Sequence, residues 1–208
     1  MSTKQKIKMP TEFSAEPKGL VIAYIGAGKG KTTAAMGMAA RAAGAGMDVF
    51  VLQFVKAKKE TGNNKEKGEW PLSSEIDFFN AVSYPSSIGS IENQQMGLGF
   101  VGILGDEKAR QEHVREALQG LERARELMLS GRYQLLVLDE LISALEVKLI
   151  EERDIVDLIK LKPKDMHLVL TGHNKYPKIL ALCDLVTEMK MIKHPYYKGI
   201  LAQRGIDY

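Results

Sequence analysis

Residues 26–33 have the composition and spacing of a phosphate-binding loop. They follow an apolar run that predicts a buried strand and precede an alanine-rich run that predicts a helix. Glycines let backbone amides turn toward an anion, and the amino end of a helix adds partial positive charge. We expect Lys31 to reach the outer phosphates of ATP. The expected ATP-binding residues of the loop are Gly26, Ala27, Gly28, Lys29, Gly30, Lys31, Thr32 and Thr33.

Two carboxylates, Asp139 and Glu140, close an apolar run that predicts another buried strand. Carboxylate and hydroxyl oxygens are ligands that Mg²⁺ prefers. We therefore expect Thr32, Asp139 and Glu140 to hold a magnesium ion beside the phosphates. The loop is one residue shorter than the common form, because Ile25 stands where a first glycine is usual. Such a shorter loop can hold a triphosphate in a different way from the phosphate-binding loop of a hydrolase.

These residues need a sheet that brings them together, and the apolar periodicity predicts one. Strands are expected at 20–25, 49–54, 76–82, 135–140, 167–171 and 185–192, and helices at 33–43, 107–130, 150–161 and 176–183. Residues 56–67 and 83–106 are expected to be loops. Alternating strands and helices predict an α/β fold of the P-loop NTPase-like (RecA-like) kind. Its mostly parallel sheet, flanked by helices in three layers, would gather the glycine turn, Asp139 and residues 171–173 at one edge.

Composition limits the function classes. Net charge is only +3 in 208 residues, which gives no argument for a nucleic-acid partner. No apolar stretch approaches the length of a membrane span, and no apolar run precedes Leu20, so we expect a cytoplasmic protein without a signal peptide.

Cys183 is the one cysteine and is expected to be a small buried hydrophobe. His113 is expected on a solvated helix face. Residues 1–17 are predicted as a flexible N-terminal arm and residues 18–208 as a single P-loop domain.

Several motifs beyond the loop are more specific. Arg41-Ala42-x-Gly44, Gln53-Phe54-x-Lys56 and Val137-Leu138-Asp139-Glu140-Leu141 occur in order. The C-terminal part contains Leu170-Thr171-Gly172, residues 184–189 (Asp-Leu-Val-Thr-Glu-Met), Lys193-His194-Pro195 and a Gly-Ile-Asp-Tyr end at 205–208. Together these resemble the ATP:corrinoid adenosyltransferases of the CobA/BtuR (CobO) type, over roughly residues 18–208.

The resemblance implies an enzyme that transfers the 5′-deoxyadenosyl group of ATP to the Co(I) of a corrinoid and releases triphosphate. Cobalt would be the nucleophile, so Lys31 and Thr32 would act on the leaving group. The resemblance also implies ATP, Mg²⁺ and a corrinoid as ligands, an electron donor such as a flavoprotein, and a homodimer. Arg41 and Lys56 match family positions and would touch ATP, or could be surface cations.

The chain departs from the family at three positions. Ala27 stands where the family usually has Asn, and His173 where it has Arg, which is not an equivalent donor. In the family's Gly-x-Gly-Phe-x-Trp segment, Phe100 is kept and Gly102 replaces Trp. Phe100 and His173 are the expected corrinoid contacts, although Phe100 could instead be a core residue.

Two alternatives remain open from the sequence. A RecA-like ATPase would release ADP and phosphate. A non-catalytic corrinoid- or nucleotide-binding paralogue would bind without turnover, and the changes at Gly102 and His173 are its main support.

Overall fold

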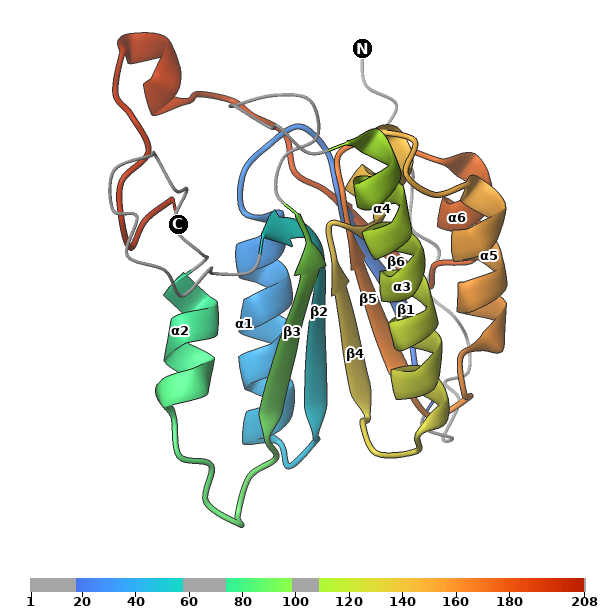
Figure 1. Cartoon of the computed structure of the whole chain (residues 1–208). Coiled ribbons are helices and arrows are strands. Elements are labelled where there is room, and N and C mark those ends of the chain that lie inside the picture. The colour runs from blue at the N-terminus through green and yellow to red at the C-terminus, as the bar shows by residue number, and fades with distance from the viewer. Residues whose placement is uncertain (1–17, 58–73, 99–108, 208) are drawn as a thin grey trace, which may run out of the picture.

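The computed structural model describes residues 18–57, 74–98 and 109–207 (Figure 1). Six parallel strands form one sheet in the order β3-β2-β4-β5-β1-β6. The strands are β1 Val21–Ile25, β2 Val49–Ala57, β3 Ile91–Gly97, β4 Leu135–Asp139, β5 His167–Thr171 and β6 Leu185–Glu188. The helices are α1 Lys31–Gly44, α2 Ser74–Ala81, α3 Arg110–Leu129, α4 Leu141–Glu146, α5 Glu152–Leu161, α6 Pro177–Leu180 and the 3-10 helix η1 Pro195–Lys198.

Helices cover both faces of the sheet and make three layers (Figure 1). α1 and α2 pack on one face, and α3 to α6 lie over the other. The central strand β4 shows why, because all of its side chains are apolar or buried. Leu135 and Val137 belong to the core beneath α1, whereas Leu136 and Leu138 belong to the core beneath α3 and α5. Strand side chains alternate between faces, so a continuous apolar run requires cover on both. The predicted α/β class is confirmed.

The order of strands decides where ligands can bind. From β1 the chain crosses to β2, on the far side of β4 and β5, and later returns to them. In open parallel sheets the carboxyl ends of strands on either side of such a reversal form a crevice. The loop after β1 and the ends of β4 and β5 therefore share one edge of the sheet.

Two sequence predictions near β3 are wrong. Residues 76–82 were predicted as a strand, but α2 covers Ser74–Ala81. Ile76 and Phe79 are buried three residues apart while Phe78 is 63% exposed, which is helical periodicity in a run too short to reveal it. The predicted loop 83–106 contains β3, an edge strand rich in Glu, Asn and Gln whose polar composition hides its pairing with β2.

Other predictions need smaller corrections. His113 is only 3% exposed, not solvated, because α3 packs across β2 and β3. The short helix α4 was not predicted, and β6 ends at Glu188 rather than at residue 192. α1 begins at Lys31, two residues before the predicted start.

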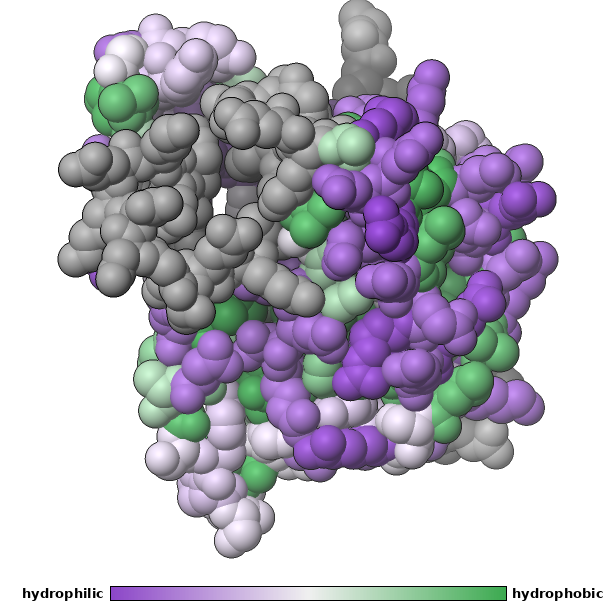
Figure 2. All heavy atoms as spheres, in the orientation of Figure 1, coloured by the Kyte–Doolittle hydropathy of each residue, from purple (hydrophilic) through white to green (hydrophobic). Residues whose placement is uncertain are grey.

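Hydrophilic residues dominate the surface over α3 (Figure 2). None of the helices in the described ranges is long and apolar enough to cross a lipid bilayer.

Cys183 gives a first testable prediction. It is half-buried against the core, and burial, followed by the nearby Asp184 carboxylate, raises the pKa of its thiol to about 11. Because only the thiolate reacts, we expect labelling by a disulfide reagent at pH 8 to be about 100-fold slower than for an unburied thiol. Labelling kinetics in buffer and in urea would measure this. Equal rates in both conditions would contradict it.

Candidate active site

The loop between β1 and α1 is held in place by its glycines. Gly26 and Gly30 have φ values of 109° and 100°, a left-handed conformation that favours glycine. The Gly26 N–H donates to the His173 carbonyl at 2.9 Å, and the Gly28 N–H donates to the Met189 carbonyl at 2.8 Å. A Cβ at Gly26 or Gly28 would lie 2.4 or 2.7 Å from the Met189 oxygen. The loop therefore packs against the ends of β5 and β6, and only glycine fits there.

Lys31 lies across this loop at the first residue of α1. Its ammonium donates to the carbonyls of Gly26 at 2.8 Å and Gly28 at 2.9 Å. Burial lowers the pKa of Lys31, and the carboxylates of Glu140, Asp139 and Glu146 oppose that shift. A partly desolvated ammonium held over a turn of backbone amides can transfer its hydrogen bonds to a bound anion.

Asp139 joins the ends of three strands to the start of α1. It is fully buried at the end of β4. Its Oδ1 accepts from the hydroxyls of Thr32 at 3.0 Å and Thr171 at 2.8 Å, and its Oδ2 accepts from the Gln53 amide at 2.9 Å. These partners come from the start of α1, from β5 and from β2. The predicted convergence of the glycine turn, Asp139 and Thr171 at one edge is therefore confirmed.

The residues beside Asp139 fit a magnesium ion. The Thr32 hydroxyl and the Asp139 carboxylate lie side by side and offer hard oxygen atoms of the kind that Mg²⁺ prefers. Glu140 follows with φ 62°, a strained conformation for a non-glycine residue, and its N–H donates to the Thr171 hydroxyl at 2.7 Å. Within the described ranges, no three His, Cys, Asp or Glu side chains cluster as a metal site. Magnesium at nucleotide sites typically takes one or two protein oxygens and completes its shell with phosphate and water.

His173 lies at the phosphate loop rather than apart from it. Its backbone carbonyl accepts from the Gly26 N–H, and its Nδ1 is 3.3 Å from the Ser143 hydroxyl and 3.8 Å from a Glu146 carboxylate oxygen. Burial and the nearby Lys31 ammonium lower the pKa of His173, against the effect of Glu146. This lowering favours the neutral imidazole, which can offer a hydrogen bond to a ligand at the loop. α4, which supplies Ser143 and Glu146, orients it.

The remaining predicted residues divide into three groups. Ala27, Lys29 and Thr33 are exposed on the loop and the first turn of α1. Arg41 lies in the last turn of α1, about 15 Å along the helix from Lys31, so the structure does not bring it to the loop. Lys56 lies near the carboxyl end of β2. Phe100 and Gly102 lie outside the described residues.

Three residues of this cluster are not among the predicted site residues: Gln53, Thr171 and Ser143. Gln53 is fully buried in β2, and its side chain also accepts from the Gln95 amide of β3 at 3.1 Å. A polar residue inside an otherwise apolar strand was the available signal, because buried amides require partners. Thr171 gave a similar signal as the last residue of an apolar strand. Ser143 gave none, because α4 was not predicted.

Gly172 provides a second prediction. A Cβ at Gly172 would lie 2.4 Å from the Ile142 Cβ and 2.9 Å from the Ser143 backbone nitrogen. Gly172→Ala should therefore push α4 from β5 and lower the free energy of unfolding by about 1–3 kcal/mol. Urea unfolding would measure the loss. Gly37→Ala is the control, since a Cβ there meets nothing within 4 Å. Equal stability of the two variants would contradict the prediction.

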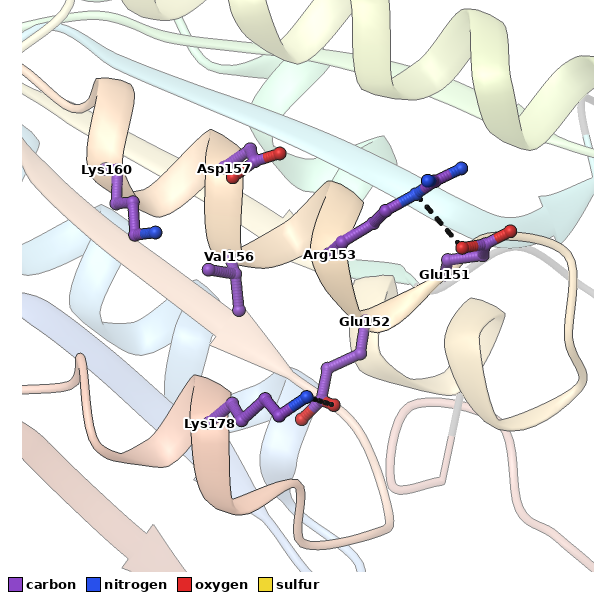
Figure 3. A pocket seen from close by; sticks show the side chains of 7 residues that line it. All are labelled: Glu151, Glu152, Arg153, Val156, Asp157, Lys160 and Lys178. Atoms are coloured by element: carbon purple, nitrogen blue, oxygen red, sulfur yellow. Dashed lines mark ion pairs between the residues drawn. The ribbon is translucent and has the colours of Figure 1, made fainter.

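A separate groove of about 460 Å³ lies along α5 and α6 (Figure 3). Its walls are charged: Glu152 pairs with Lys178 at 3.7 Å, and Arg153 with Glu151 at 3.0 Å. No residue predicted for the active site lines it. Such exposed pairs contribute little and are typical of a solvated face.

Comparison with known proteins decides between the interpretations of this site. The family model described as ATP:corrinoid adenosyltransferase BtuR/CobO/CobP matches residues 17–208. The chain belongs to this adenosyltransferase family. A corrinoid adenosyltransferase from Sinorhizobium sp. is 35% identical over 93% of this chain and 82% of that protein. One from Escherichia coli K12 is 29% identical over 99% and 93%.

The predicted family resemblance is therefore confirmed over nearly the whole described structure. Among solved structures, the assembled ATPase EscN from enteropathogenic E. coli matches with TM-score 0.41 and 15% identity, over 82% of this chain and 42% of that one. The family assignment, and not that distant likeness, favours an adenosyltransferase over a RecA-like ATPase.

Proposed function

We propose that this adenosyltransferase-family chain transfers the 5′-deoxyadenosyl group of ATP to the Co(I) of a corrinoid such as cob(I)alamin. The observation that carries the proposal is a magnesium-compatible phosphate loop inside a family-wide match, with cation, hydroxyl and carboxylates gathered at one edge. The reaction needs no nucleophile from the protein. Its demands are alignment of C5′ with cobalt and stabilisation of the leaving triphosphate.

The step balances as a displacement at carbon. The Co(I) electron pair forms the cobalt–C5′ bond, the C5′–oxygen bond breaks, and its electron pair leaves on triphosphate. Cobalt is formally oxidised to Co(III). The Lys31 ammonium and the loop amides stabilise the charge on the departing oxygens, so their contribution grows as that bond breaks.

Thr32, Asp139 and Glu140 are proposed to hold Mg²⁺, which would supply further positive charge to the triphosphate. Asp139 also orients the Thr32 hydroxyl through their hydrogen bond. His173, supported by Ser143 and Glu146, is proposed to contact the ligand at the loop in place of the family's arginine.

The proposal includes finer expectations. An electron donor such as a flavoprotein reduces Co(II) to Co(I), the chain works as a homodimer, and it acts in the cytoplasm. Because Gly102 replaces the family's tryptophan, reduction of Co(II) is the step most exposed to change, whereas transfer from pre-reduced Co(I) should proceed.

The fate of ATP tests the proposal against its alternatives. Phosphorus NMR of an anaerobic reaction with Mg-ATP should show triphosphate, formed only when cob(I)alamin is present. ADP and phosphate formed without corrinoid would instead indicate an ATPase. Nucleotide binding without any product would indicate a non-catalytic paralogue.

A further inference from the structure

Residues 189–207, here called the C-terminal strap, leave the sheet after β6 and return to the phosphate loop. At one end, the Met189 N–H donates to the Ile25 carbonyl at 2.8 Å, and its carbonyl accepts from Gly28 at 2.8 Å. At the other end, the Asp207 carboxylate pairs with the Lys29 ammonium at 2.5 Å. That contact, followed by the Gln203 N–H, lowers the pKa of Asp207. Both ends of the strap are therefore fixed to the candidate active site.

The strap is ordered by turns rather than by a core. The His194 Nδ1 accepts from the Tyr196 N–H at 3.1 Å, Gly199 turns with φ 74°, and the Ile200 N–H donates to the Pro195 carbonyl at 3.2 Å. As far as the described residues go, neither hydrophobic core includes a strap side chain. The strap thus has a defined shape while its side chains stay available.

Large apolar and aromatic side chains of the strap face solvent. Figure 2 shows apolar residues at its surface at the upper left. The exposed fractions are Met191 40%, Ile192 85%, Tyr196 66%, Tyr197 75%, Ile200 44%, Leu201 76% and Ile206 82%. The rings of Tyr196 and Tyr197 stand edge to face, with centroids 6.0 Å apart. Grouped exposure of this kind marks a binding surface, because burying it against a ligand is favourable.

We propose that the C-terminal strap is the wall of the corrinoid site, with Tyr196, Tyr197 and their apolar neighbours packing on the corrin ring. This rests on the proposed function. Cobalt must reach C5′ of an ATP whose phosphates lie on the loop, so the macrocycle must lie beside that loop, where both strap ends are fixed. A corrin offers a wide apolar surface with methyl groups. An adenine is smaller and would cover only one of the two tyrosine rings.

Charge supports the same occupant. The strap carries Lys190, Lys193, Lys198 and Arg204, against Asp207 as its one acidic residue. Corrinoids carry peripheral amides or carboxylates, and cobalamin adds a phosphodiester. An apolar surface edged by cations therefore matches a large apolar ring with polar or anionic substituents.

The test measures binding of hydroxocobalamin in the presence of Mg-ATP by equilibrium dialysis, so it does not depend on turnover. Y196A/Y197A should raise the Kd for hydroxocobalamin about tenfold or more, with the Kd for nucleotide unchanged. Ile192→Ser is a second variant expected to act in the same direction. Leu129→Ala is the matched control, because Leu129 is 60% exposed at the end of α3, before β4 begins.

The strap variants should melt at the wild-type temperature, because the substituted side chains are exposed. Unchanged corrinoid affinity in both would overturn the inference. If the variants also change from dimer to monomer by light scattering, the strap covers a second copy of the chain instead. A higher Kd for nucleotide with an unchanged Kd for hydroxocobalamin would indicate that adenine, and not the corrin, packs on the strap. If the wild type binds Mg-ATP but no corrinoid, the proposed function itself fails, which the wild-type measurement shows separately.

Discussion

Lys31→Ala is expected to lower kcat/KM for adenosyl transfer by about 10²- to 10³-fold, because it removes the cation that stabilises the leaving triphosphate. Lys31 is partly buried and bonded to two loop carbonyls. Without it, the carboxylates of Glu140, Asp139 and Glu146 would act on the loop without the ammonium that now lies among them, and an anionic ligand would be repelled. Steady-state kinetics with pre-reduced cobalamin would measure the effect.

Lys18→Ala is the matched control for Lys31. Its side chain is 68% exposed, and its ammonium pairs with Asp184 at 3.1 Å, at the amino end of β1 and away from the loop. Activity of the Lys18 variant should stay within about twofold of wild type, since exposed pairs contribute little. A Lys31 variant that kept more than a tenth of wild-type activity would contradict the role proposed for this ammonium.

Asp139→Asn is the second substitution with a large expected effect. In the wild type, the hydroxyls of Thr32 and Thr171 and the Gln53 amide all donate to the Asp139 carboxylate. Asn keeps the shape of the side chain but turns an amide donor toward at least one of these donors. Leaving buried donors poorly matched should lower the free energy of unfolding by about 1–3 kcal/mol. Loss of the carboxylate at the proposed magnesium site should also lower kcat/KM about 10²-fold or more.

Urea unfolding and Mg²⁺-dependent kinetics separate the two effects of Asp139→Asn. The Mg²⁺ concentration needed for half-maximal rate should rise, which a purely structural defect would not produce. Asp157→Asn is the control, because Asp157 is an exposed carboxylate on α5 in the charged groove of Figure 3. An unaltered Mg²⁺ requirement in Asp139→Asn would contradict the metal role, whatever its stability.

Local chemistry explains which parts of the site were predictable. Glycines with positive φ, a lysine at the start of a helix, and carboxylates after an apolar strand follow from short-range rules, so residues 26–33 and Asp139 could be predicted. The network around Asp139 could be anticipated only in outline. Its partners Gln53 and Thr171 come from strands whose neighbours are set by the tertiary order of the sheet.

The errors have physical causes. The strand predicted at residues 76–82 is wrong because a single two-turn helix with adjacent phenylalanines, here α2, lacks a clear period. β3 was missed because an edge strand need not bury both faces, and its middle residues are polar and partly exposed. The position of His173 at the loop depends on α4, a short helix that starts from the strained Glu140 and has no sequence signal of its own.

The most direct test of the central claim is formation of a cobalt–carbon bond. The protein would be mixed anaerobically with Mg-ATP and chemically reduced cob(I)alamin, and the corrinoid spectrum would be followed before and after illumination. We expect adenosylcobalamin, recognised by its light sensitivity, in equal amount to released triphosphate. Absence of a light-sensitive product, while Mg-ATP and corrinoid both bind, would contradict it.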